Sequence, residues 1–224
     1  MIQAVLFDLF ETLVTESNVP VRRASSLAAE LGVSEDAYRR LWRSRRPDIV
    51  LGRSSFRDTL AQIVRTLGGT PDDSLLEQLR AERVRQKVAT LRTVEPDILS
   101  AIGTLRARGL QLAVVTNTFP EDVAGWESSL LRSLFDLTVF SYAAGLAKPD
   151  PEIYLFACRK LQVSPDRALF IGDGGDDELA GARSAGLRST RALWFISRWP
   201  SATLAPDDPG LWHAADVLDA AMAA

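Results

Sequence analysis

The segment Ala4-Val5-Leu6-Phe7-Asp8-Leu9-Phe10-Glu11-Thr12-Leu13 decides the fold, because four apolar residues run directly into an aspartate. A short apolar run that ends at a polar turn predicts a buried strand. We therefore expect a strand at residues 4–7, with the Asp8 carboxylate at its carboxyl end. A carboxylate there can attack an electrophile and form a covalent intermediate, although a turn aspartate without a catalytic role has the same pattern.

Strand-like runs alternate with helical runs after Pro96. We predict strands over residues 112–115, 137–140, 168–171 and 190–193, with helices between them and a short helix over residues 214–222. Such alternation is typical of an α/β fold with a parallel sheet and helices on both faces. Ligands bind at the carboxyl ends of the strands in these sheets, and Asp8, Thr116 and Asp173 each lie at such an end.

Residues 21–87 interrupt this pattern with helices and no convincing strand. Gly32 and Gly68-Gly69 are stop signals, and Ser34 before acidic residues is a start signal. Residues 15–94 hold 15 Lys/Arg against 10 Asp/Glu, whereas the rest of the chain holds 11 against 19. This contrast fits either a solvated, Arg-rich surface or a basic lid over an acidic, cation-binding core.

The composition argues against several classes of protein. A net charge of −3 argues against nucleic acid as the main partner. The single cysteine, Cys158, fits a reducing compartment, and the single histidine, His213, argues against a zinc site. No apolar run approaches the length of a membrane span, and the N-terminus lacks the pattern of a signal peptide. We expect a cytoplasmic protein without a membrane partner, either a monomer or a homodimer.

Two further segments carry polar residues that suit phosphate chemistry. Thr116 and Asn117 follow a predicted strand, where a hydroxyl and backbone amides can hold phosphate oxygens. Lys148, held before the turn Pro149-Asp150-Pro151, can neutralise a nucleophilic carboxylate and a developing phosphoryl charge. Ordinary turn residues and an exposed lysine would give the same pattern.

A cluster of acidic residues follows the strand predicted over residues 168–171. It consists of Asp173, Asp176, Asp177 and Glu178. Clustered carboxylates repel one another unless a cation or protons compensate. Oxygen ligands of this kind suit Mg²⁺, so the cluster is either a magnesium site or an acidic loop at the start of a helix.

Together, the four segments resemble the motifs of the haloacid dehalogenase-like (HAD) hydrolase superfamily, over nearly the whole chain. The resemblance identifies Asp8 as the nucleophile, Thr116 as the hydroxyl of the second motif and Lys148 as the lysine of the third. Asp173 and Asp177 match the acidic pair of the fourth motif, and Glu178 stands where some relatives carry the second acid.

The resemblance also implies an organisation and a cofactor. It implies a Rossmann-like core formed by residues 1–14 and 95–224, and an inserted helical cap at residues 15–94 that covers the site and selects the substrate. Mg²⁺ is the implied cofactor, with the predicted ligands Asp8, the backbone carbonyl of Phe10, Asp173, Asp177 and Glu178. The candidate substrate-binding residues are Thr12, Asn117, Arg43 and Arg46; the two arginines fit a solvated helix surface equally well.

Phe10 and Glu11 depart from the family pattern. Phosphatases of the family usually carry aspartate two residues after the nucleophile, as acid for the leaving group and base for water, and Phe10 cannot transfer a proton. Loss of a general acid/base typically costs about 10²–10⁴-fold in rate. Glu11 replaces a usual glycine and is a possible substitute acid, although adjacent side chains usually point in different directions.

Three functions follow as hypotheses. The first is a Mg²⁺-dependent phosphohydrolase that acts on a small phosphorylated, anionic metabolite through an aspartyl-phosphate. The second is a metal-independent 2-haloacid dehalogenase, whose relatives carry an aromatic residue at the position of Phe10; Asp173 favours the first, and Arg22, Arg23 and Arg39 are possible cap arginines for the second. The third is a catalytically weak binding or regulatory protein, which the presence of all four motifs disfavours.

Overall fold

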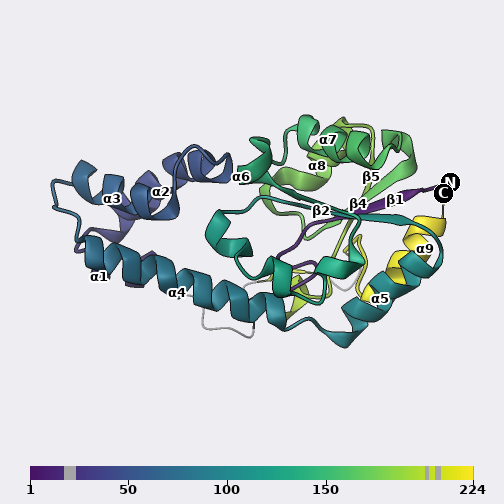
Figure 1. Cartoon of the computed structure of the whole chain (residues 1–224), viewed down its shortest axis with the longest axis horizontal. Helices are drawn as coiled ribbons and strands as arrows, with labels where there is room; N and C mark the ends of the chain where they lie inside the picture. The colour runs from purple at the N-terminus through teal and green to yellow at the C-terminus, as the bar shows by residue number, and fades with distance from the viewer. Residues whose placement is uncertain (18–23, 200–201, 205–207, 224) are drawn as a thin grey trace.

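Five parallel strands form the central sheet, in the order β3-β2-β1-β4-β5 (Figure 1). The computed structural model describes residues 1–17, 24–199, 202–204 and 208–223. The strands are β1 (Ala4–Phe7), β2 (Gln111–Thr116), β3 (Leu137–Phe140), β4 (Ala168–Gly172) and β5 (Arg188–Arg191). The predicted α/β fold with a parallel sheet is confirmed.

The central strand β1 brings the polar strand ends together. Phe7 is level with Val114 of β2 and with Ile171 of β4. Asp8 therefore leaves the sheet between the ends of its two neighbours, which lead into Thr116 and Asp173. Every residue of β1 is apolar and buried, as expected for a parallel strand that is covered on both faces.

Helices cover both faces of the sheet (Figure 1). Helices α5 and α9 pack on one face, α7 and α8 pack on the other, and the short α6 follows β3. Their bounds are α5 (Pro96–Ala107), α6 (Ser141–Ala144), α7 (Pro151–Leu161), α8 (Glu178–Ser184) and α9 (Val217–Met222). Val5 and Phe7 of β1 join the first apolar cluster, whereas Ala4 and Leu6 join the second, because successive side chains of a strand point to opposite faces.

Four helices between β1 and α5 extend away from the sheet and form what we call the helical insertion (Figure 1). They are α1 (Ala24–Glu30), α2 (Glu35–Val50), α3 (Phe56–Thr66) and α4 (Asp73–Arg92). They share an apolar cluster of their own, in which Ile49, Leu60 and Leu76 are fully buried. Between residues 24 and 94 the structure shows helices and no strand. The division at residues 15–94 stays a prediction.

Some predicted details differ in the structure. The last strand lies at Arg188–Arg191 rather than at residues 190–193, because its backbone pairs with β4 while the apolar Leu193 is buried beyond it. Ser34 precedes α2, but its side chain makes no capping hydrogen bond. The first predicted helix begins at residues 21–23, which lie outside the described residues. Among those described, no helix is both long and apolar enough to cross a membrane.

Candidate active site

Asp8, Lys148 and Glu178 form a buried chain of charges at the carboxyl edge of the sheet. Lys148 Nζ lies 2.5 Å from Asp8 Oδ1 and 2.5 Å from Glu178 Oε2. Asp8 follows β1, Lys148 lies on the loop between α6 and α7, and Glu178 opens α8. All three residues are buried, so the two carboxylates share one ammonium away from water.

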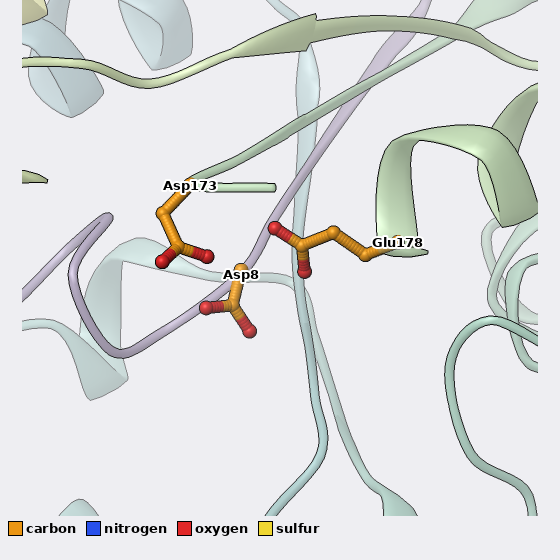
Figure 2. Close-up of side chains that lie close together, drawn as sticks. All are labelled: Asp8, Asp173 and Glu178. Carbon is orange, nitrogen blue, oxygen red and sulfur yellow. The ribbon is translucent and has the colours of Figure 1, made fainter. Parts of the chain in front are cut away.

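Asp8, Asp173 and Glu178 form a group of three carboxylates, whose side chains converge in Figure 2. Each offers one oxygen atom, and these atoms lie within 4.8 Å of one another. Among the described residues, Lys148 is the cation with ion pairs to this group, so three ionised carboxylates would leave a net negative charge. Oxygen donors with excess negative charge are the ligands that Mg²⁺ prefers, so this group fits a magnesium ion.

Burial and the neighbouring charges shift the pKa values of Asp8, Glu178 and Lys148. Burial raises the pKa of Asp8; the ammonium of Lys148 opposes the shift, and the Asp173 carboxylate adds to it. Burial likewise raises the pKa of Glu178 to about 8, with Lys148 opposing and Asp8 adding. Burial alone would lower the pKa of Lys148, but the charges of Asp8 and Glu178 raise it above its ordinary value. The two carboxylates thus favour the charged form of Lys148.

Glu178 joins this group, whereas the neighbouring Asp177 does not. The Gly174 N–H donates a hydrogen bond to Glu178 Oε1 at 2.9 Å, and the Tyr154 hydroxyl donates to the Glu178 carbonyl at 2.7 Å. Asp177 is exposed and lies outside the group of three carboxylates. Spacing alone left both residues as candidates, because the backbone of this turn decides which one points inward.

Gly172 leaves the space that the Glu178 carboxylate occupies, since a Cβ added there would lie 2.0 Å from Glu178 Oε1. We expect Gly172→Ala to lower the free energy of unfolding by about 1–3 kcal/mol, as overpacking does, and to reduce turnover by displacing that carboxylate. Gly103→Ala is the matched control. Gly103 lies inside α5, and a Cβ added there would have no neighbour within 4 Å apart from the backbone of its own helix. It should stabilise the protein by about 0.5–1 kcal/mol. Equal urea midpoints for the two variants would contradict this account.

The second motif contributes one hydroxyl and one carboxamide. Thr116 is buried at the end of β2. Asn117, the next residue, makes hydrogen bonds with the backbone of Lys148 and with the side chain of Asp176.

Thr12 is fully buried; its hydroxyl has no partner among the described residues, and its carbonyl accepts a bond from the Trp194 indole at 2.9 Å. The structure thus places Thr12 in the interior of the protein, against Trp194.

Phe10 and Glu11 both have structural partners. The ammonium of Lys87 lies 3.9 Å from the centroid of the Phe10 ring. The Glu11 carboxylate accepts hydrogen bonds from Thr15 Oγ1 at 2.8 Å, from the Glu16 N–H at 2.8 Å and from the Trp199 indole at 2.7 Å. Glu11 therefore stabilises the turn after the nucleophile, at a backbone φ of 57°.

A pocket of about 300 Å³ lies between α2 and the loops that carry Lys148 and Asp176. Arg46 lines it and donates hydrogen bonds of 2.9 and 3.2 Å to the Asp176 carboxylate. Val50 and Leu51 supply an apolar wall. The sequence placed Asp176 in the acidic cluster but did not predict its contact with Arg46; the signal for this contact was the opposite charge of the insertion and the core.

The other candidate arginines lie elsewhere. Arg43 is exposed and is not among the residues that line this pocket. Arg39 pairs with Glu35 on the same helix at 2.6 Å. Arg22 and Arg23 lie outside the described residues. Of the predicted cap arginines, the structure thus brings Arg46 to the site.

Comparison with known proteins gives the chain its relatives. A model of the haloacid dehalogenase-like hydrolase family matches residues 2–186. A glyceraldehyde 3-phosphate phosphatase of Methanopyrus kandleri is 29% identical over 198 residues, which are 85% of this chain and 84% of that protein. An (S)-2-haloacid dehalogenase 4A of Burkholderia cepacia is 27% identical over 201 residues, which are 85% of this chain and 82% of the relative.

A solved structure shares the fold over the full length. The 2-haloacid dehalogenase of Pseudomonas syringae pv. Tomato superposes with a TM-score of 0.66 at 22% identity, and the match covers 100% of this chain and 99% of that one. At this identity the likeness speaks for the fold alone. The relatives thus include both phosphatases and dehalogenases, so they do not decide between the two reactions.

Proposed function

Because the chain belongs to the haloacid dehalogenase-like hydrolase family, we propose that it is a Mg²⁺-dependent phosphohydrolase of a small phosphorylated metabolite. The observation that carries this proposal is the convergence of Asp8, Asp173 and Glu178 around a site with only one ammonium. A divalent cation compensates the negative charge of such a group. Halide displacement from a haloacid by one carboxylate has no comparable need for three.

Asp8 is the nucleophile in this proposal. Its carboxylate attacks phosphorus, the bond from phosphorus to the leaving oxygen breaks, and an aspartyl-phosphate forms. Lys148, which contacts Asp8, holds the phosphoryl oxygens and opposes the effect of burial on the Asp8 carboxylate by favouring its ionised form. Thr116 donates its hydroxyl to the same group. Water then attacks phosphorus, the bond from phosphorus to the Asp8 oxygen breaks, and inorganic phosphate leaves with the protons of the water, which restores the Asp8 carboxylate.

Asp8, Asp173 and Glu178 would hold the magnesium ion, with the carbonyl of Phe10 as a further predicted ligand. The ion supplies charge stabilisation to the transferred group. Phe10 provides no proton for the leaving group. The proposal therefore predicts a preference for substrates whose leaving group needs little protonation, such as acyl or aryl phosphates over alkyl phosphates.

The pocket beside Lys148 suits a small anionic substrate. Its volume of about 300 Å³ is at the low end for ligand sites. Arg46 lines the pocket and pairs with Asp176 through two of its N–H groups, and its remaining N–H groups can bind a second anionic group, such as a carboxylate. The relatives named above include a phosphatase of a three-carbon sugar phosphate, which agrees with this size.

The second candidate is a 2-haloacid dehalogenase, and Phe10 is the observation that favours it. Release of halide needs no proton, so an aromatic residue in place of the acid has no chemical cost there. A named dehalogenase is among the relatives. Both candidates use Asp8 and Lys148, and they differ in the need for a metal.

One assay separates the two candidates. Purified protein is given a panel of aryl, acyl and sugar phosphates and of 2-haloacids, each with Mg²⁺ and with chelator. We expect phosphate release that depends on Mg²⁺ and falls by at least about 10²-fold with chelator, because the metal supplies several kcal/mol of charge stabilisation. Chelator-resistant halide release would overturn the proposal in favour of the dehalogenase. If the protein turns over neither class of substrate, the third hypothesis remains, that of a catalytically weak binding or regulatory protein.

A further inference from the structure

The side-chain carboxamide of Asn117 makes two hydrogen bonds with the backbone of Lys148, one with its N–H and one with its carbonyl. The Lys148 N–H donates to Asn117 Oδ1 at 2.8 Å, and Asn117 Nδ2 donates to the Lys148 carbonyl at 2.8 Å. Asn117 directly follows β2, whereas Lys148 lies on a loop. The two bonds therefore fix the backbone of Lys148 to the end of β2, an interior strand of the sheet. This position matters because the Lys148 ammonium must reach Asp8 and Glu178.

The remaining donor of Asn117 is also in use. Its Nδ2 lies 3.0 Å from Asp176 Oδ2, and Asp176 in turn accepts the guanidinium of Arg46 on α2. A carboxamide has two N–H donors and one oxygen, and each of them has a partner here. The side chain of Asn117 thus has no donor left for a substrate, although its place in the second motif predicts substrate binding.

We infer that the side chain of Asn117 positions Lys148 rather than binding the substrate, and that the helical insertion acts on it through Arg46 and Asp176. The chain of contacts runs from α2 through Asp176 and Asn117 to the backbone of Lys148. These contacts fix the orientation of the Asn117 carboxamide, because its nitrogen can donate to the Asp176 carboxylate and its oxygen cannot. For its kinetic readout the inference rests on the proposed function.

Asn117→Asp tests the inference, because it keeps the acceptor for the Lys148 N–H, removes both donors and sets a carboxylate against Asp176. We expect kcat to fall about 10- to 100-fold while KM changes less than about 3-fold, as for a group that acts only in the transition state. Asn117→Asp/Asp176→Asn removes the repulsion and restores the hydrogen bond between the two side chains, with the donor now on residue 176, so it should recover about 5-fold in kcat, the value of one hydrogen bond. Gln62→Glu, the same change at an exposed site on α3, should leave both constants unchanged.

A rise in KM with unchanged kcat would overturn the inference, because it would make Asn117 a substrate ligand. Loss of kcat without any rescue in the double variant would overturn it as well. Hydrogen exchange of the Lys148 amide needs no substrate, so it separates this inference from the proposed reaction. That amide should exchange slowly in the unmodified chain and in Asn117→Asp, which retains the acceptor, and at least about 10-fold faster in Asn117→Ala, since a lost hydrogen bond permits local opening. Equal rates in all three proteins would overturn the positioning role even if phosphate esters are hydrolysed.

Discussion

Asp8→Asn is expected to lower turnover by at least about 10⁴-fold, because removal of a covalent nucleophile leaves only binding and electrostatic contributions. Asparagine keeps the size and polarity of the side chain but cannot form the acyl-phosphate. The change also removes one charge from a group whose burial opposes ionisation, and Lys148 keeps Glu178 as its partner, so the free energy of unfolding should not fall. Phosphate release at saturating substrate and Mg²⁺ measures the rate, and urea denaturation measures the stability.

A contaminating phosphatase is the main alternative source of activity, and Asp8→Asn is its control. Activity that survives this change does not come from Asp8. Covalent labelling gives an independent readout: mass spectrometry after acid quench should find a phosphoryl group on the peptide of Asp8 in the unmodified chain and none in the variant. Equal activity of the two proteins, purified in the same way, would refute Asp8 as the nucleophile.

Lys148→Met is expected to have the second largest effect, on activity and on stability together. Methionine fills a similar volume without the ammonium, so Asp8 and Glu178 face each other without a partner. Removal of one member of a buried ion pair costs about 3–5 kcal/mol in the free energy of unfolding. Loss of a preorganised charge at the reacting group should lower kcat by about 10²–10³-fold.

A double variant separates the two effects. Lys148→Met/Glu178→Gln removes one of the two carboxylates that lost their partner, so it should recover part of the stability without recovering kcat. Arg159→Met is the matched control, because Arg159 has a 3.3 Å ion pair with Glu152 in which both side chains are more than half exposed. Exposed pairs contribute about 0–1 kcal/mol, so this control should unfold almost like the unmodified chain. A loss of stability in Lys148→Met no larger than in this control would contradict the buried pair.

The sequence predicts the sheet and the place of the site because both follow from local patterns. Apolar runs of four or five residues mark β1 and β4, and the residues directly after them are Asp8 and Asp173. Parallel strands carry their carboxyl ends to one edge, so the meeting of these two residues needs no long-range information. The family resemblance adds Lys148, whose distance from Asp8 along the chain hides the contact.

The partners of Asn117 and the choice between Asp177 and Glu178 could not be predicted in the same way. Asp176 and Asp177 adopt φ values of 51° and 53°, and this left-handed turn decides which carboxylate points inward. Non-glycine residues rarely adopt that conformation, so propensity alone argues against it. The contact of Arg46 with Asp176 joins segments 130 residues apart, and its geometry depends on how the helical insertion packs.

The Glu11 turn has a consequence for how this sequence can evolve. A glutamate at a φ of 57° carries a backbone penalty of roughly 1–2 kcal/mol that glycine would avoid. Its carboxylate also bonds the indole of Trp199, which lies beyond the stretch of residues 2–186 shared with the family. A glycine at position 11 would remove the acceptor of the Trp199 indole N–H. Loss of Trp199 would leave the strained glutamate with one hydrogen-bond partner fewer. Each position thus restricts which mutations the other can accept, and descendants of this chain should keep or lose the two residues together.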